Sequence, residues 1–365
     1  MADDTIPVRP DEGFDEDALA DYLRGRLDGA DGPLAVRQFG GGAANLTYLL
    51  DFTAAEPERQ YVLRRPPRGP TPEGAHDMER EYTVLSTLHE PYPLAPEAFL
   101  YCGAPEVIGA EFFVMERRTG VVVRSGELPE AFADANDAPQ RMSRALVDGL
   151  ADLHAVDYDQ IGLGDLGHAE GFIERQIDRG YERWQAAWTD DLPAEAADAM
   201  REAHDWLAAH RPPFREGALV HNDYKLDNLM LAEGDPGEAV AVFDWDMATL
   251  GDPLSDLGAL LTYWAQPSDP APFRQIAQMP LDERFPDRAA LVRRYAEQSG
   301  RDLAELRERL PFYHALGLFR LTVIIAQIYQ RYRRGQTRDE RFAALDRMIP
   351  VTARAAVDVA HGRFG

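Results

Sequence analysis

The chain has 365 residues, of which 45% are hydrophobic and 28% charged, and its 63 acidic residues outnumber the 38 basic ones, giving a net charge of −25. This is the composition of a globular protein long enough for two lobes, and the negative charge argues against nucleic acid or an anionic membrane as a partner. The single cysteine, Cys102, excludes an intrachain disulfide and a metal site built from cysteines.

Acidic residues are spread along the whole chain and are dense near its start. Over residues 1 to 18 we expect a solvated acidic leader, which need not be ordered. An acidic start without an apolar segment does not fit a signal peptide, and the lone cysteine fits a reducing compartment, so we expect a cytoplasmic protein. The acidity could steer a cationic substrate, but its spread along the whole chain favours a surface suited to a salty cytoplasm. Nothing in the sequence indicates an obligate protein partner.

Residues 19 to 118 are predicted to form a small lobe built on a β-sheet. Four runs of β-type residues lie here, at 34 to 39, 46 to 52, 60 to 65 and 111 to 118. Glycines join the first two runs in a hairpin-like unit. Apolar residues at helical spacing predict one helix before the last run, with Met78, Tyr82, Leu85 and Leu88 on one face.

Residues 119 to 365 are predicted to form a larger, mainly helical lobe. The residue pattern predicts a helix over 141 to 157, β-type runs at 218 to 221, 229 to 233 and 238 to 246, and helices from 254 onward. The most apolar stretch, 321 to 329, is flanked by Arg320 and Arg331. It is shorter than a membrane span, so we expect a buried helix.

Residues 221 to 228 read His-Asn-Asp-Tyr-Lys-Leu-Asp-Asn and include Lys225, the only lysine in the chain. A hairpin between the β-type runs would bring Asn228 near Asp244. An amide oxygen and a carboxylate, completed by water and phosphate oxygens, suit Mg²⁺. Asp223 could then accept a proton from a hydroxyl that attacks a phosphate held by that metal.

The same eight residues resemble the kinase catalytic-loop pattern H-x-D-x-x-x-x-N, and Phe-Asp-Trp-Asp at 243 to 246 lies where kinases have their second metal-binding aspartate. The chain is similar, over about residues 35 to 260, to the aminoglycoside phosphotransferase and choline kinase superfamily. It looks most like the branch related to the kinase domain fused to some acyl-CoA dehydrogenases. The resemblance implies an α+β, protein-kinase-like fold of two lobes that uses ATP and Mg²⁺.

By this resemblance, Asp223 is the catalytic base, and Asn228 and Asp244 are the Mg²⁺ ligands. Lys225 would present its ammonium to the γ-phosphate. Two residues are implied as structural supports of the loop: His221 and Asp256.

The resemblance also implies a nucleotide site in the small lobe, with glycines that let backbone N–H groups approach the phosphates. Its implied residues are Gly40, Gly41, Gly42, Asn45, Arg64, Glu81, Met115 and Glu116. Arg64 stands where lysine is usual and is expected to pair with Glu81; Arg65 and Glu79 are the alternatives. Asn222 stands where glycine is common.

We therefore expect transfer of the γ-phosphoryl group of ATP to a hydroxyl of a small molecule, by positioning and charge neutralisation. The resemblance favours a hydroxyacyl-CoA or hydroxy acid as acceptor over an amino alcohol or an aminoglycoside. The alternatives are a nucleotide-binding pseudokinase that acts as a regulator or scaffold, and a metal-dependent hydrolase that uses His221, Asp223 and Asp244.

Overall fold

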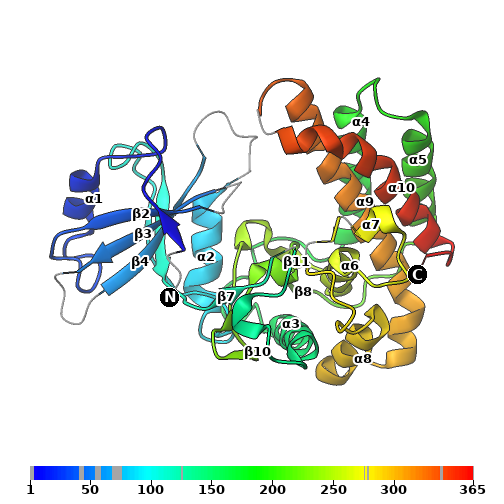
Figure 1. Cartoon of the computed structure of the whole chain (residues 1–365), viewed down its shortest axis with the longest axis horizontal. Helices are drawn as coiled ribbons and strands as arrows, with labels where there is room; N and C mark the ends of the chain where they lie inside the picture. Colours follow the sequence, from blue (N-terminus) through cyan, green and yellow to red (C-terminus); the bar gives the residue numbers. More distant parts are fainter. Residues whose placement is uncertain are drawn as a thin grey trace. The chain divides into compact units, whose positions relative to one another are not determined.

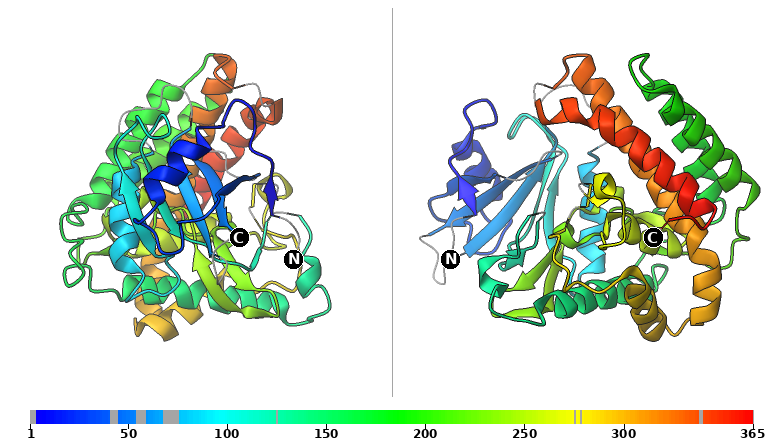
Figure 2. Two further views of the ribbon diagram at one scale, coloured as in Figure 1. Left: turned by 90° about the vertical axis from the view of Figure 1, so that its left-hand side faces the viewer. Right: turned by 45° about the vertical axis from the view of Figure 1, so that its right-hand side comes forward.

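The computed structural model describes residues 4–40, 45–53, 59–67, 76–124, 126–274, 276–277, 279–337 and 340–364. The chain divides into two compact units, both drawn in Figures 1 and 2. The first unit contains residues 1 to 119 and 240 to 248, and the second contains residues 120 to 239 and 249 to 365. The sequence pattern places residues 240 to 248 in the second region, but they pack with the first unit.

The first unit is a six-stranded antiparallel sheet with two helices. Its strands are β1 (Thr5–Ile6), β2 (Ala35–Phe39), β3 (Leu46–Phe52), β4 (Arg59–Arg65), β5 (Ala98–Cys102) and β6 (Phe112–Glu116), in the spatial order β1-β2-β3-β4-β6-β5. Its helices are α1 (Glu16–Leu23) and α2 (Met78–Leu88), and the short 3-10 helix η3 (Trp245–Met247) belongs to the same unit. The four predicted β-runs and the predicted helix are all present; β1, β5 and α1 are additional.

The acidic leader expected over residues 1 to 18, whose order the sequence left open, contains β1 and the first residues of α1 in its described part. Strand β1 pairs with the end of β2, Thr5 opposite Phe39. Helix α1 begins after Asp15, whose side chain accepts a hydrogen bond from the Ala18 N–H. The acidic residues there cap a helix and form its solvated face, while its leucines are buried. Charge density alone therefore does not reveal the helix.

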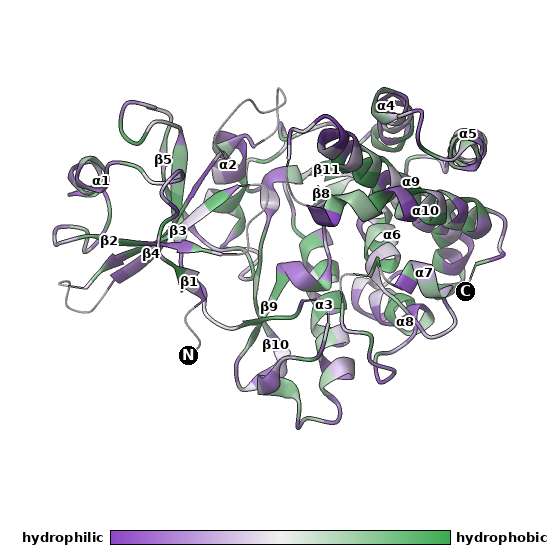
Figure 3. Ribbon diagram, turned by 45° about the horizontal axis from the view of Figure 1, so that its top comes forward, coloured by the Kyte–Doolittle hydropathy of each residue, from purple (hydrophilic) through white to green (hydrophobic). Residues whose placement is uncertain are grey.

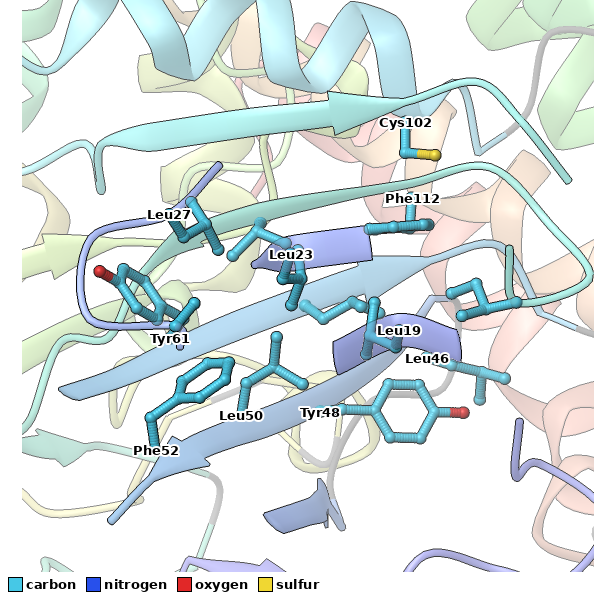
Figure 4. Packing of buried hydrophobic residues seen from close by; sticks show 14 residues of the cluster. Leu19, Leu23, Leu27, Leu46, Tyr48, Leu50, Phe52, Tyr61, Cys102 and Phe112 are labelled. Atoms are coloured by element: carbon cyan, nitrogen blue, oxygen red, sulfur yellow. The ribbon is translucent and has the colours of Figure 1, made fainter. Parts of the chain in front are cut away.

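Helix α1 covers one face of the sheet, and the apolar side chains of helix and strands form a hydrophobic core between them (Figure 4). Leu19 and Leu23 pack against alternate residues of β3, among them Tyr48 and Leu50, and all four side chains are fully buried. Alternate residues of a strand point to opposite faces. The intervening residues of the central strands are therefore directed toward the other face.

Helix α2 packs against β5 and β6 on that other face. It begins after Asp77, whose side chain accepts from the Arg80 N–H, and it buries Leu85 and Leu88. The segment 240 to 248 joins this side of the unit: the Val242 N–H donates to the Leu94 oxygen at 2.7 Å. Trp245 is buried edge-on against Tyr92.

The second unit is mainly helical. Its helices are α3 (Ala138–His154), α4 (Phe172–Ala187), α5 (Ala194–Ala209), α6 (Leu254–Tyr263), α7 (Ala271–Arg274), α8 (Arg288–Ser299), α9 (Leu303–Arg333) and α10 (Leu345–Ala360). Its strands are β7 (Val121–Val122), β8 (Ala218–Val220), β9 (Leu229–Ala232), β10 (Asp235–Val242, which ends in the first unit) and β11 (Thr249–Gly251). Short 3-10 helices are η1 (Glu130–Phe132), η2 (Leu226–Asn228) and η4 (Glu340–Ala344).

Helix α9 is the central helix of this unit and packs against α4, α6 and α10 (orange, with α10 in red, in Figures 1 and 2). By length and composition it could cross a membrane, but 78% of its most apolar window is buried within the protein. This agrees with the predicted buried helix. The outer helix α5 carries hydrophilic and hydrophobic residues together (Figure 3), because only one of its faces is buried.

Two glycines allow α6 and α9 to approach closely. A Cβ atom added at Gly258 would lie 2.3 Å from the main-chain oxygen of Tyr313, and one at Gly317 would lie 2.9 Å from the Gly258 oxygen. No side chain fits at such distances. The contact therefore fixes α6, which carries Asp256, against α9, which carries Arg320.

Candidate functional site

The loop predicted to be catalytic lies between two strands of the second unit. Strand β8 pairs with β11, and the chain then runs through residues 221 to 225 into η2 and β9. Tyr224 is buried and its hydroxyl donates to the Leu146 oxygen on α3 at 3.0 Å. The loop is thereby attached to the helical core.

Asp223, Lys225 and Asn228 form one compact cluster in this loop. The Lys225 ammonium lies 3.0 Å from Asp223 Oδ1 and 2.8 Å from Oδ2. Asn228 Nδ2 donates to the main-chain oxygen of Asp223 at 2.9 Å and to its Oδ2 at 3.1 Å. The Asp223 carboxylate is thus held by two side chains from its own loop.

This pairing gives Lys225 a partner that the sequence did not predict. Although burial acts to lower the pKa of Lys225, the Asp223 carboxylate raises it above its ordinary value, so the amine is a firm cation. The ammonium also lies 5.1 Å from the ring centre of Tyr263. Its predicted contact with the γ-phosphate remains a prediction.

A buried carboxylate accepts hydrogen bonds from the main chain of the loop. Asp256, at the start of α6, accepts from the N–H of His221 at 2.7 Å and from the N–H of Asn222 at 2.8 Å. His154 Nε2 lies 3.3 Å from the same carboxylate. Burial alone would raise the pKa of Asp256, but its hydrogen bond with His154 and its interactions with the neighbouring His221 lower it, so the carboxylate is ionised.

His221 itself contributes through its ring, because its Nδ1 accepts the Asp223 N–H at 3.3 Å. His154 extends the network outward: its Nδ1 lies 2.8 Å from the hydroxyl of Tyr295 on α8. The two residues implied as supports, His221 and Asp256, therefore contact the main chain of the loop directly.

Asp227 lies next to the loop cluster, where burial disfavours the ionised form of its carboxyl group. Burial raises its pKa to about 6, and nearby Lys225 opposes the shift. Within the described residues its Oδ1 atom is buried without a hydrogen-bond partner.

The first unit contains a second cluster, around Arg64 of β4. Its Nε lies 2.9 Å from Oε2 of Glu81 on α2, and its Nη2 contacts Asp244 Oδ1. Glu81 and not Glu79 is therefore its partner. Arg65 points elsewhere, since its Nη1 donates to the Ile108 oxygen at 3.0 Å.

Burial and charge pairing act against each other in this cluster. For Glu81 burial prevails and raises the pKa to about 7, against the effect of Arg64. The two carboxylates raise the pKa of Arg64 in spite of its burial, so the guanidinium is the fixed charge. Asp244 has φ 71°, in the left-handed region, and directly precedes η3. This conformation is uncommon for a residue with a side chain and turns the chain sharply after β10.

The other residues predicted to bind nucleotide lie in the same unit. Asn45 is buried; its Oδ1 lies 2.7 Å from His76 Nδ1, and its Nδ2 has no hydrogen-bond partner among the described residues. Gly40 directly follows β2 in a turn, whereas Gly41 and Gly42 lie outside the described residues.

Met115 and Glu116 end β6, which runs between β4 and β5. The N–H of Glu116 donates to the Glu97 oxygen at 2.8 Å, and its carboxylate pairs with Arg118. This N–H belongs to the sheet, so it is not a donor for adenine in this conformation.

The donor set fits a hard cation at the predicted residues only in part. Asn228 uses its nitrogen to hold Asp223, and within the described residues no hydrogen bond reaches its Oδ1, an oxygen of the kind that Mg²⁺ prefers. Asp244 has a carboxylate that is one-third exposed. No group of three or more His, Cys, Asp or Glu side chains that could hold a metal occurs in the part of the chain that is described.

A sequence profile described as "Phosphotransferase enzyme family" matches residues 35–308. The chain belongs to the phosphotransferase enzyme family. Among relatives of this phosphotransferase-family protein, a Gallus gallus protein named acyl-CoA dehydrogenase family member 11 is 31% identical over 364 residues. The match covers 97% of this chain and 44% of the chicken protein. The Mus musculus protein named acyl-CoA dehydrogenase family member 10 is 31% identical, with 91% and 30% covered. The chain thus spans less than half the length of these relatives.

This phosphotransferase-family member matches solved structures over nearly its whole length. A candidate aminoglycoside phosphotransferase from Ralstonia eutropha matches with a TM-score of 0.77 and 29% identity, over 96% of this chain and 99% of that one. Choline kinase from Cryptosporidium parvum matches with a TM-score of 0.66 at 11% identity, over 96% and 98%. The fold is the predicted protein-kinase-like α+β fold.

Two contacts of the loop were missed from the sequence. Arg320, which lies between the buried Phe319 and Leu321 on α9, contacts Asn222. A cation inside a buried apolar helix needs a polar partner, and this was the available signal. The side chain of His154 is also buried, and its ring contacts Asp256, the carboxylate that holds the loop.

Proposed function

We propose that the protein is an ATP- and Mg²⁺-dependent phosphotransferase that moves the γ-phosphoryl group to a hydroxyl of a small molecule. The observation that carries the proposal is the cluster of Asp223, Lys225 and Asn228 within one loop of a phosphotransferase-family chain. A structural neighbour, aminoglycoside phosphotransferase APH(4)-Ia, was solved in a ternary complex with AMP-PNP and hygromycin B, with a TM-score of 0.59 at 19% identity over 94% of this chain. The AMP-PNP in that complex supports a nucleotide as the donor.

In this proposal Asp223 accepts the proton of the acceptor hydroxyl, and Asn228 and Asp244 bind Mg²⁺ with the phosphate oxygens. Magnesium would neutralise charge on the phosphates during transfer. Arg64, held by Glu81, would contact the nucleotide phosphates in place of the usual lysine, because a guanidinium can bind two oxygens at once. The proposed acceptor is a hydroxyacyl-CoA or a hydroxy acid.

The test is ADP release from Mg·ATP with a panel of hydroxyacyl-CoAs, hydroxy acids, amino alcohols and amino sugars. At least one acceptor should raise ADP release above the rate with water, and chelation of Mg²⁺ should abolish the increase. Nucleotide binding without ADP release from any acceptor would instead indicate a pseudokinase. Turnover of a substrate without ATP would indicate a metal-dependent hydrolase.

Lys225 is proposed to contact a phosphoryl oxygen during transfer. Its ammonium has three N–H donors, and two contacts go to the Asp223 oxygens. Replacement of Lys225 by Met should lower kcat by about 100-fold, because charge stabilisation of this kind contributes about 3 kcal/mol to the transition state. The measurement is ADP release at saturating ATP and acceptor. An unchanged kcat in Lys225→Met would exclude this role.

A further inference from the structure

The residue that precedes Asp223 has an unusual backbone. Asn222 has φ 66°, in the left-handed region that glycine enters without cost. Asparagine is among the few other residues that enter this region, because its short polar side chain can form hydrogen bonds locally. The conformation still needs contacts that hold it, since most residues avoid it.

Arg320 supplies such contacts from 98 positions further along the chain. Its Nη1 donates to Asn222 Oδ1 and its Nη2 donates to the Asn222 main-chain oxygen, each at 3.3 Å. One planar guanidinium thus holds both the side chain and the peptide of a single residue. The main-chain oxygen of Asn222 lies in the same rigid peptide plane as the Asp223 N–H. Fixing that oxygen therefore fixes the direction from which the Asp223 side chain leaves the backbone.

The same stretch is held from α6 by a charge of opposite sign. Asp256 accepts the N–H groups of His221 and Asn222, and Arg320 donates to the oxygen of Asn222. Three consecutive peptide units up to Asp223 are therefore each attached to a charged side chain, the buried Asp256 or the half-buried Arg320. Burial lowers the pKa of Arg320, and the carboxylates of Asp256 and Asp223 counteract this shift.

The two helices that supply these charges are themselves locked together. Gly258 of α6 and Gly317 of α9 meet backbone to backbone, at the turns next to Asp256 and Arg320. The distance between the two charges is therefore set by a close helix contact and does not depend on flexible side chains alone.

We propose that Arg320 is a positioning residue that directs the carboxylate of Asp223 through the peptide oxygen and side chain of Asn222. The role rests on the proposed function of Asp223 as the base. Arg320 needs no contact with nucleotide or acceptor to fulfil it.

The first test does not require activity. Because Lys225 is the only lysine, protein grown with ¹⁵N-lysine gives a single backbone amide signal, two residues after Asp223. In Arg320→Gln this signal should shift or broaden while the circular dichroism spectrum stays that of the wild type. The control is Arg331→Gln, which removes an exposed charge from the same helix and should leave the signal in place. An Arg320→Gln signal that coincides with the wild-type signal would overturn the proposal.

The second test measures turnover of Mg·ATP. Arg320→Gln should lower kcat by about 10-fold or more, since small displacements of a reacting group cost this much, with KM for ATP within about threefold of wild type. Wild-type kcat in Arg320→Gln would overturn the proposal. Absence of turnover in the wild-type protein would overturn the proposed function instead, and the lysine signal would still decide the role of Arg320.

A pair of variants at Asn222 keeps the proposal testable if Arg320→Gln fails to fold. Asn222→Gly enters the left-handed region freely and retains the main-chain oxygen that Arg320 contacts. Asn222→Ala retains the oxygen but disfavours the conformation. We expect Asn222→Ala to lose several-fold more kcat than Asn222→Gly. Equal kcat in the two variants would contradict the proposed route through Asn222.

Discussion

Replacement of Asp223 by Asn should lower kcat by about 1,000-fold and change the dissociation constant for ATP by less than about threefold, because a general base contributes 100-fold to 10,000-fold. The amide of Asn has nearly the shape of the carboxylate but cannot accept a proton at neutral pH. Lys225 would also lose the partner that raises its pKa. The measurements are ADP release at saturating Mg·ATP and acceptor, and ATP binding by calorimetry.

The matched control for this substitution is Asp205→Asn, at a carboxylate that is 71% exposed and lies outside the loop cluster. It should leave both quantities at their wild-type values. If Asp223→Asn retains a kcat within about threefold of wild type, Asp223 is not the base, and the residue that carries proton transfer must be sought elsewhere.

Replacement of Asp256 by Ala should lower the free energy of unfolding by about 3–5 kcal/mol, because two buried N–H groups and His154 would lose their acceptor. Urea denaturation at neutral pH measures this loss. The exposed control Asp198→Ala, which removes a surface ion pair with Arg201, should change stability by less than about 0.5 kcal/mol.

The cost of Asp256→Ala should also depend on pH. The folded-state pKa of Asp256 lies below the ordinary 3.8, so its stabilising effect is present above that value and is lost as pH falls through the folded pKa. The difference in stability between wild type and Asp256→Ala should therefore be constant near neutral pH and shrink in acid. A difference that stays constant down to acid unfolding would show that the ionised form of Asp256 is not what holds the loop.

Local patterns predicted much of the fold because they record which face of each element is buried. Strand β3 coincides with the predicted run 46 to 52, and α2 begins at Met78, where the apolar stripe begins. Strand β5 was missed because its short run lies among turn residues, and α1 was missed because acidic residues surround Leu19 and Leu23. Charge density was read there as solvation, although burial of two leucines decides the structure.

At the site, the sequence supplied the residue types of the loop but not the directions of their side chains. The spacing from Asp223 to Asn228 indicates a catalytic loop, yet it cannot show that Lys225 turns back onto Asp223. The residue pattern could not predict contacts with helices distant in sequence, such as those made by His154 and Arg320. Periodicity marks such residues as buried and leaves their partners open.

The division of the chain has a practical consequence for any fragment that contains the first unit alone. The chain crosses from one unit to the other three times, after residues 119, 239 and 248. A fragment that stops at Thr119 would lack Trp245 and Asp244, leaving Tyr92 without its aromatic neighbour and Arg64 with one carboxylate fewer. A stable fragment of the first unit would therefore need residues 240 to 248, either connected through a designed linker or added as a separate peptide.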